Sequence, residues 1–262
     1  MLRRLPYLGR HGRANRWRRS RGALRVWAHR GASADATENT VAAFELARAQ
    51  GADGVELDVR LDASGEVVVF HDEDLERLAR RPGRVEELSA DERRAVRLVG
   101  GHALPTLAEA IEAVGPLELN VELKSASPGR AGALARATAA VLRRSGAIDR
   151  VVVSSFDPLA LLQCYRHLPE LSLAYLFHSR QPAPLRRGWL SYAVGASLVH
   201  PDFPLCDEDS VRRWHAAGYA INVWTVDDPA ELRRLDRLGV DGVFANAPGA
   251  ARAALATPEP AP

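Results

Sequence analysis

Past residue 23, the chain alternates between two patterns of hydrophobic and polar positions. Short β-branched apolar runs predict buried strands, and stretches with apolar residues three and four positions apart predict helices. The predicted strands are 25–29, 54–59, 67–71, 117–123, 151–155, 172–177, 197–200, 220–226 and 241–245. The predicted helices are 39–50, 106–114, 131–145, 158–168, 207–217 and 228–238.

Strands that alternate with helices indicate an α/β protein with parallel strand pairing. Seven or eight such units favour a closed (β/α)8 TIM barrel over an open sheet, and we place this barrel at residues 24–250. The alternation is interrupted at residues 73–103, which are rich in charge, only partly helical in pattern, and predict an insertion. This insertion is expected on the rim that carries active sites in such barrels, either as a lid or as a purely structural addition.

The two ends of the chain differ from the body in composition. Residues 1–23 carry eight arginines and no acidic residue, which predicts a disordered basic arm. The alternative is an arm that makes weak peripheral contact with anionic lipid or nucleic acid. Residues 251–262 predict a disordered tail.

Charge and hydropathy narrow the class of protein. The formal charge is +2, but without the eight arginines of the arm 27 basic side chains face 33 acidic ones, a net of −6. We therefore expect no nucleic-acid partner for the body. The chain is 47% apolar, yet no apolar run approaches the about 20 residues that span a bilayer. A cytoplasmic enzyme without a transmembrane segment is expected, with Cys164 and Cys206 as free thiols.

Polar residues occur within or directly after three of the predicted strands. His29 and Arg30 end the first, Glu56 and Asp58 lie in the second, and His71 ends the third. Because the C-terminal ends of barrel strands meet at one rim, these side chains are expected to share a site. Glu56 and Asp58 are two residues apart and so leave the same face of their strand. On an exposed edge strand the same alternation would be only a surface pattern.

The predicted strand 117–123 extends this cluster. It would add Glu122 as a third carboxylate beside Glu56 and Asp58, and three carboxylates suit Mg2+ or Ca2+ better than zinc. Lys124 follows on the same strand face and is the only lysine in the chain. A compact ammonium fits among carboxylates and a phosphate, so Lys124 is a candidate phosphate ligand.

The remaining candidates concern proton transfer and substrate contact. His29 and His71 flank the acidic cluster and predict an acid–base pair, while the planar guanidinium of Arg30 suits phosphate oxygens. This combination points to metal-assisted cleavage of a phosphoester. Asp72 either orients His71 or caps the insertion, and Trp224 is either an aromatic wall for an alkyl or glycerol group or a core residue. The other histidines are interpreted as surface or core residues: His102, His167, His178, His200 and His215.

Several motifs in order resemble the glycerophosphodiester phosphodiesterase family. They are His29-Arg30-Gly31, Glu38-Asn39-Thr40, Gly51-Ala-Asp with Glu56-Leu-Asp58, His71-Asp72, Leu104-Pro105-Thr106, Glu122-Leu-Lys124, Ser155-Phe156, Trp224-Thr-Val226 and Gly239-Val-Asp-Gly-Val-Phe244. The chain departs from the family pattern at Thr37, where proline is usual, and at Ala245, where threonine is common. Neither departure removes a predicted catalytic group.

The resemblance implies a TIM barrel with a short insertion after the second barrel strand, which agrees with residues 73–103, and it implies a role for each site residue. Glu56, Asp58 and Glu122 would bind the metal; His29 and His71 would be the acid–base pair. Arg30 and Lys124 would bind phosphate, and Trp224 would line the glycerol side. The implied reaction hydrolyses a small-molecule glycerophosphodiester to sn-glycerol 3-phosphate and an alcohol, by attack of water or of the substrate's neighbouring hydroxyl.

Two other functions are compatible with the sequence. A lysophospholipase D-type or sphingomyelinase-like phosphodiesterase would need an apolar channel for an acyl chain, for which Trp189, Leu190 and Tyr192 are candidates. A non-catalytic lipid- or phosphate-binding barrel would use the basic arm as a membrane tether and would bind without turnover.

Overall fold

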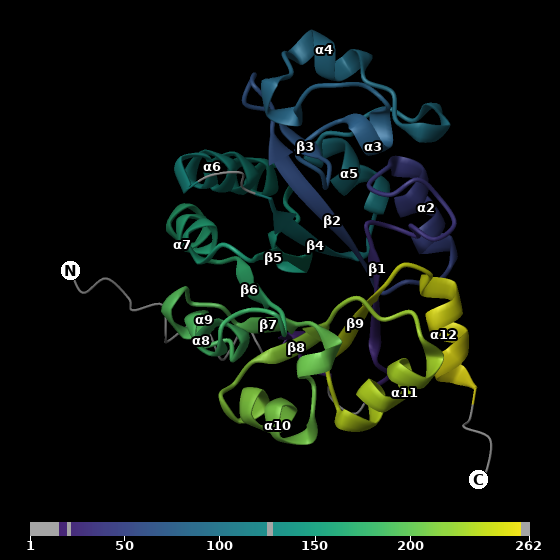
Figure 1. Cartoon of the computed structure of the whole chain (residues 1–262), viewed down its shortest axis with the longest axis vertical. Coiled ribbons are helices and arrows are strands. Elements are labelled where there is room, and N and C mark those ends of the chain that lie inside the picture. The colour runs from purple at the N-terminus through teal and green to yellow at the C-terminus, as the bar shows by residue number, and fades with distance from the viewer. Residues whose placement is uncertain (1–15, 20–21, 125–127, 258–262) are drawn as a thin grey trace.

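Eight parallel strands form a closed barrel in the computed structural model, which describes residues 16–19, 22–124 and 128–257 (Figure 1). Closure follows from β1, which pairs with β9 on one side and with β2 on the other. The barrel strands are β1 (Arg25–His29), β2 (Gly54–Leu61), β4 (Glu118–Leu123), β5 (Val151–Ser155), β6 (Ser172–Phe177), β7 (Leu198–Pro201), β8 (Ala220–Val223) and β9 (Gly242–Ala245). The predicted (β/α)8 barrel is confirmed.

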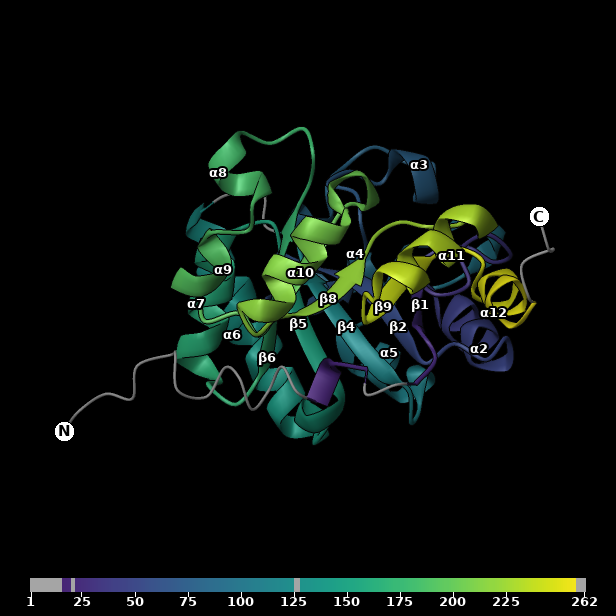
Figure 2. The same cartoon turned by 90° about the horizontal axis from the view of Figure 1, so that it is seen from below.

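Helices connect these strands on the outside of the barrel (Figures 1 and 2). They are α2 (Val41–Ala49), α5 (Leu107–Val114), α6 (Pro128–Ser145), α7 (Pro158–His167), α8 (Ala183–Arg186), α9 (Leu190–Ala193), α10 (Glu208–Ala216), α11 (Pro229–Leu238) and α12 (Pro248–Ala256). Short 3-10 turns occur at Ile148–Arg150 and Phe203–Leu205. Polar N-caps begin several helices; Thr106, for example, forms a reciprocal capping box with Glu109 at the start of α5.

Alternate residues of each strand serve two different cores. Val55, Leu57 and Val59 of β2 join the large cluster under the helices, as period-two alternation requires. The other parity fills the barrel, where Trp27 belongs to a small interior cluster. Gly54 makes room for this indole, because a Cβ there would lie 2.4 Å from the Trp27 ring.

The third predicted strand is not a barrel strand. β3 (Val67–Val69) runs antiparallel to β2, with Val59 opposite Val69, and forms a hairpin that projects from the barrel. The prediction that 67–71 ends at the rim like a parallel strand is therefore wrong in its geometry. His71 reaches the rim because the hairpin returns the chain to it, and the Phe70 amide donates to the Asp58 carbonyl (2.9 Å).

The insertion follows this hairpin and shares with it a small core that is separate from the large core of the barrel. It contains α3 (Glu76–Ala79), α4 (Ala90–Ala95) and 3-10 turns at Val85–Glu87 and Val99–Gly101. It forms the top of the molecule in Figure 1. Nine apolar residues bury one another there: Val68, Phe70, Leu75, Leu78, Val85, Leu88, Val96, Leu98 and Leu104.

The prediction of a disordered tail from residue 251 is wrong for residues 251–256. These residues belong to α12, in which Pro248 occupies the first turn and Ala251 is buried. The helix packs against α11 and the first barrel strand, β1, so the alanine-rich sequence after Pro248 is part of the helical layer that covers the barrel. Residues 258–262 lie outside the described residues.

The predicted disordered arm lies mostly outside the described residues, but the structure differs from the prediction at 16–19. The Trp17 side chain is 1% exposed, stacks near Trp27 at 6.0 Å between ring centroids, and donates from Nε1 to Ser172 Oγ (2.8 Å). Next to it, the Arg19 amide donates to Asp241 Oδ1 (2.8 Å). This segment therefore packs against the barrel.

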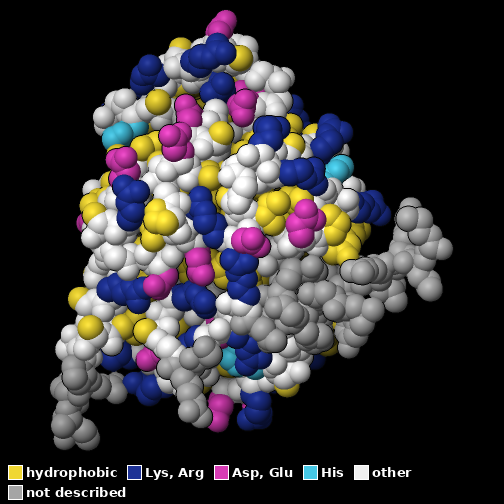
Figure 3. Space-filling view, turned by 180° about the vertical axis from the view of Figure 1, so that it is seen from behind, with side chains coloured by type: hydrophobic (Ala, Val, Ile, Leu, Met, Phe, Trp, Pro, Cys, Tyr) yellow, Lys and Arg dark blue, Asp and Glu magenta, His cyan; other side chains and the backbone are white. Residues whose placement is uncertain are grey.

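The surface and the helices show two further general features. On the face in Figure 3, basic and acidic side chains are interspersed. None of the helices among the described residues is both long and apolar enough to cross a membrane.

Removing the Trp17 ring should destabilise the barrel. We expect Trp17→Ala to lower the free energy of unfolding by about 3–5 kcal/mol, because it deletes a buried indole and leaves a cavity. Chemical denaturation is the measurement, and Trp189→Ala is the control, since Trp189 is 62% exposed. Equal effects of the two substitutions would show that Trp17 does not pack on the barrel in solution.

Candidate active site

Three buried carboxylates from neighbouring strands form the centre of the site. Asp58 and Glu122 face each other across β2 and β4, and Glu56 stands opposite His29 of β1. Ligand oxygens of Glu56, Asp58 and Glu122 all lie within 4.8 Å of one another. The structure thus brings together the three residues predicted as metal ligands.

This donor set fits a hard divalent cation. All donors are oxygens, and Glu56 Oε1 is buried and has no hydrogen-bond partner among the residues that the structure describes. Burial, and then the charges of Asp58 and Glu122, raises the pKa of Glu56 well above its usual value. Burial also raises the pKa of Glu122 against the opposing charge of Lys124. A cation bound at this point would remove the repulsion between the carboxylates.

Lys124 and Arg30 supply the positive charge that is present. Lys124 Nζ lies 2.6 Å from Glu122 Oε1 and 3.2 Å from Asp58 Oδ1, and Arg30 Nε lies 3.2 Å from Asp58 Oδ2. Burial would raise the pKa of Asp58, but the charges of Lys124 and Arg30 outweigh it and hold this pKa well below the usual range. Asp58 is therefore ionised, and both cations stand beside the candidate metal position.

Asn39 was not identified as a site residue from the sequence. It is fully buried, adopts a left-handed conformation with φ of 57°, and donates from Nδ2 to Asp58 Oδ2 (2.9 Å). Asp58 in turn donates its amide to Asn39 Oδ1 (3.3 Å). The sequence signal for Asn39 is its place in Glu38-Asn39-Thr40, one of the motifs that carry the family resemblance.

His29 is oriented by a relay that starts at Asp227, in the loop between β8 and α11. Asn246 Nδ2 donates to Asp227 Oδ2 (2.6 Å), so its Oδ1 faces His29 Nδ1 (2.7 Å) and accepts the proton of that nitrogen. His29 Nε2 is left without the proton and lies 4.0 Å from Glu56 Oε2. Burial, and then the charge of Arg30, lowers the pKa of His29.

His71 is oriented in the same sense by a carboxylate. Its Nδ1 donates to Asp72 Oδ1 (2.8 Å), which leaves Nε2 for the cavity. Arg60 fixes the backbone, since its Nε and Nη2 donate to the His71 carbonyl (3.0 and 2.9 Å). Burial lowers the pKa of His71, while the Asp58 charge opposes this shift. Of the two roles considered for Asp72, the structure shows the orienting one.

Both histidines open into a cavity of about 160 Å³ at the barrel mouth. Trp224 lines it, packs edge-on against Phe156 at 5.5 Å between centroids, and donates from Nε1 to the His200 carbonyl (2.8 Å). Trp224 is thus both a wall of the cavity and a packed residue. His200 is a core histidine that also lines the cavity, and burial lowers its pKa to about 3.

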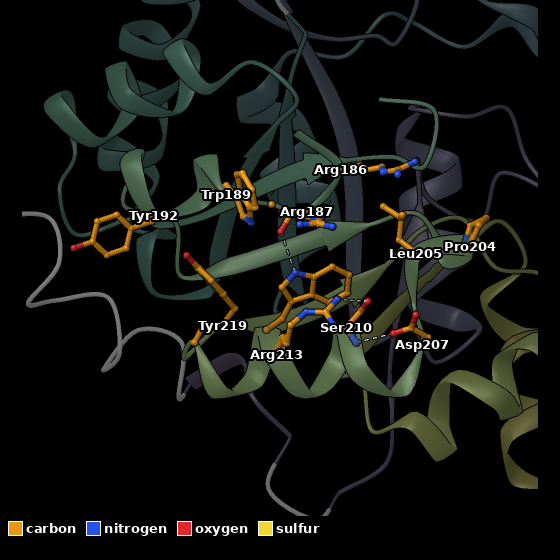
Figure 4. A pocket seen from close by; sticks show the side chains of 13 residues that line it. Arg186, Arg187, Trp189, Tyr192, Pro204, Leu205, Asp207, Ser210, Arg213 and Tyr219 are labelled. Atoms are coloured by element: carbon orange, nitrogen blue, oxygen red, sulfur yellow. Dashed lines mark hydrogen bonds between the residues drawn. The ribbon is translucent and has the colours of Figure 1, made fainter. Parts of the chain in front are cut away.

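A second hollow lies elsewhere, between α8–α9 and α10 (Figure 4). It measures about 840 Å³, and Arg186, Arg187, Trp189 and Tyr192 are among its lining residues. None of the described lining residues is shared with the cavity at the barrel mouth. Two of the three acyl-channel candidates, Trp189 and Tyr192, therefore line a hollow separate from the histidines.

The mouth of this TIM barrel brings together three buried carboxylates that could hold a metal ion, two histidines, an arginine and a lysine, an arrangement typical of a phosphoesterase. The sequence model of the glycerophosphoryl diester phosphodiesterase family matches residues 29–250. The chain belongs to this family.

Individual relatives can be aligned with this chain over most of their own length. A glycerophosphodiester phosphodiesterase of Caldanaerobacter subterraneus subsp. tengcongensis is 31% identical, with 85% of this chain and 94% of the relative covered. A probable glycerophosphodiester phosphodiesterase 1 of Mycobacterium tuberculosis is 34% identical over 88% of this chain and 92% of its own. An Oleispira antarctica phosphodiesterase, solved in complex with the product sn-glycerol-3-phosphate, has a TM-score of 0.79 at 29% identity and covers 90% and 98% of the two chains.

The hydrogen-bond partners predict the tautomers of both histidines. Because the pKa of each is lowered, His29 and His71 should be neutral at pH 7.5 and carry the proton on Nδ1. Long-range 1H–15N correlation spectra test this, with assignment from His29→Gln and His71→Gln. Asn246→Leu should abolish the preference of His29 for the tautomer protonated on Nδ1. The same substitution should leave the signals of His71 unchanged. A change at both histidines, or at neither, would contradict the relay.

Proposed function

We propose that this protein hydrolyses glycerophosphodiesters to sn-glycerol 3-phosphate and an alcohol. The observation that carries the proposal is the pair His29 and His71, each presenting Nε2 to one cavity beside three buried carboxylates. Membership of the family and the product bound to the Oleispira antarctica relative support it.

Glu56, Asp58 and Glu122 would hold the divalent cation, which we propose to be Mg2+ or Ca2+. When bound, this ion supplies positive charge to the phosphate oxygens and neutralises the carboxylates. Oxygen ligands without imidazole or thiolate favour these hard ions over zinc.

Arg30 and Lys124 hold the phosphate in the proposed reaction. Lys124 Nζ has three donors, and its contacts with Asp58 and Glu122 leave one for a phosphate oxygen. Arg30 is restrained by Glu38 and Asp58 on its side chain, while its backbone amide donates to Glu56 Oε2 (2.9 Å). Two cations held in this way orient the phosphodiester relative to the histidines.

The two histidines differ in their partners, which divides the proton transfers between them. Nδ1 of His71 is paired with the carboxylate of Asp72, which stabilises an imidazolium; Nδ1 of His29 is paired with the neutral amide of Asn246. We infer that His29 accepts the proton of the attacking hydroxyl at Nε2, and that His71 reacts in its doubly protonated form, a minor fraction at pH 7.5 that the Asp72 carboxylate stabilises. This imidazolium donates its Nε2 proton to the leaving alcohol, and proton exchange with solvent then restores both histidines. The hydroxyl belongs either to water or to the substrate's own glycerol.

The cavity favours a small polar group beside Trp224. Its volume of about 160 Å³ lies below the range of roughly 300–1,000 Å³ typical of sites for larger organic ligands. A glycerol moiety against the indole is the proposed fit. Among the described residues that line this cavity, none is an acyl-channel candidate of the lysophospholipase D-type alternative (Trp189, Leu190 or Tyr192). The cytoplasmic location and the membrane contact of the basic arm stay predictions.

Turnover tests the proposed function against both alternatives. Purified protein with Mg2+ or Ca2+ should release glycerol 3-phosphate from glycerophosphocholine, and His29→Gln should lower kcat about 100- to 10,000-fold because it removes the base. The control is His167→Gln, a histidine at the end of α7 that is absent from the residues lining the cavity. No product from any glycerophosphodiester would refute the proposal, and release from lysophospholipids alone would favour the alternative enzyme.

Metal affinity tests the carboxylate cluster without turnover. Calorimetric titration with Ca2+ and with Mg2+ should show one site on the metal-free protein, weakened at least about tenfold in Glu56→Gln because a ligand oxygen is lost. Glu118→Gln is the matched control, since Glu118 lies on the same β4 strand as Glu122 but pairs with Arg25 at the strand's opposite end (3.2 Å). Equal affinities in the two variants would contradict this assignment of the ligands.

A further inference from the structure

Arg77, on helix α3 of the insertion, bridges two carboxylates at the rim of the site. Its Nε donates to Asp72 Oδ2 (2.6 Å), and Nη1 and Nη2 donate to Glu38 Oε2 and Oε1 (2.9 and 2.7 Å). One planar guanidinium therefore joins two acidic side chains that belong to different parts of the barrel rim. A fork of this shape suits such a bridge, whereas an ammonium acts as a single point charge.

Each of the two carboxylates also holds a residue of the proposed machinery. Glu38 Oε1 accepts from Arg30 Nη1 (2.8 Å), and Asp72 Oδ1 accepts from His71 Nδ1 (2.8 Å). The five charged or ionisable side chains form one continuous series, from Arg30 through Glu38, Arg77 and Asp72 to His71. The phosphate ligand and the proton donor are thus connected through the insertion.

Helix α3 is held by a small core that the insertion shares with the β3 hairpin. Leu75 and Leu78, on either side of Arg77 in sequence, are buried in this core. The Leu75 amide donates to the Gly83 carbonyl (3.0 Å), which closes the loop around α3. The Arg77 side chain itself is 48% exposed, so it contributes little to the buried core. Its ion pairs with Glu38 and Asp72 therefore fix the positions of these two side chains and add little to the free energy of unfolding.

We propose that Arg77 is a positioning residue, and that the insertion sets the distance and orientation between Arg30 and His71. The proposal rests on the proposed function for the roles of these two residues. One planar guanidinium, that of Arg77, holds Arg30 and His71 in a fixed relative position. This matters because small displacements of catalytic groups greatly lower the reaction rate. In this role Arg77 itself does not contact the substrate. The insertion contributes to catalysis by positioning Arg30 and His71.

Paired variants of two arginines on the insertion test this role. Arg77→Gln should lower kcat on glycerophosphocholine at least about tenfold and raise KM several-fold, because both ends of the bridge are released. Arg84→Gln is the control: Arg84 is 45% exposed and pairs with Glu73 (2.8 Å), outside the series. The two variants should have the same thermal midpoint. Arg77→Lys should recover only part of the activity.

Two readouts separate this proposal from the proposed function. If the wild-type protein hydrolyses no glycerophosphodiester, the proposed function fails, but inorganic phosphate affinity and the His71 15N signals still report on the bridge. We expect Arg77→Gln to weaken phosphate binding about tenfold and to alter the His71 tautomer signals, with Arg84→Gln unchanged. If phosphate does not bind the wild type, the His71 signals alone decide.

Three outcomes would overturn the role of Arg77. The first is kinetic constants in Arg77→Gln equal to those of Arg84→Gln. The second is His71 signals identical to the wild type. The third is an activity loss that only follows a lowered thermal midpoint and disappears on cooling, since a positioning role predicts a loss at every temperature at which the protein is folded.

Discussion

The buried charge at the mouth of the barrel is the constraint on which the rest of the site depends. Three carboxylates within 4.8 Å of one another repel strongly where water is excluded, so the fold must supply compensating cations. Lys124 and Arg30 do this in the protein itself, and the unpaired Glu56 Oε1 leaves a position that a divalent ion suits. The same residues are the ones that would hold a phosphate. The two residues that compensate the charge of the carboxylates are therefore the same two that would bind the substrate.

Around this centre, each functional side chain is held by a second polar group. Asn246 and Asp227 orient His29, Asp72 and Arg60 orient His71, and Asn39 holds Asp58. Apart from Arg60, which lies within β2, these partners come from the rim segments that follow the strands. A barrel with short, hydrogen-bonded rim segments can thus keep two Nε2 atoms directed at one cavity. The insertion adds Arg77, which connects segments that would otherwise be held separately.

Much of the fold and of the site centre could be predicted because both depend on period and spacing. Period-two alternation placed Glu56, Asp58 and Glu122 inside the barrel, and closure of the barrel brought His29 to the same rim. Two predictions failed for local reasons. Residues 67–71 read as a parallel strand because an antiparallel hairpin has the same apolar pattern. Residues 251–256 read as a tail because an alanine-rich segment has little amphipathic signal of its own.

The sequence by itself determined the strand-and-helix order, the parity of the carboxylates and the single lysine among them, since these follow from neighbours along the chain. Only the tertiary structure decided which nitrogen each histidine presents, because the deciding partners are remote: Asn246 lies 217 residues from His29. The burial of Trp17 against Ser172, 155 residues away, and the bridge from Arg77 to Glu38, 39 residues away, depend on the same kind of contact. Such contacts are set by how the barrel closes and where the hairpin returns. The local pattern of hydrophobic and polar residues does not predict these long-range contacts.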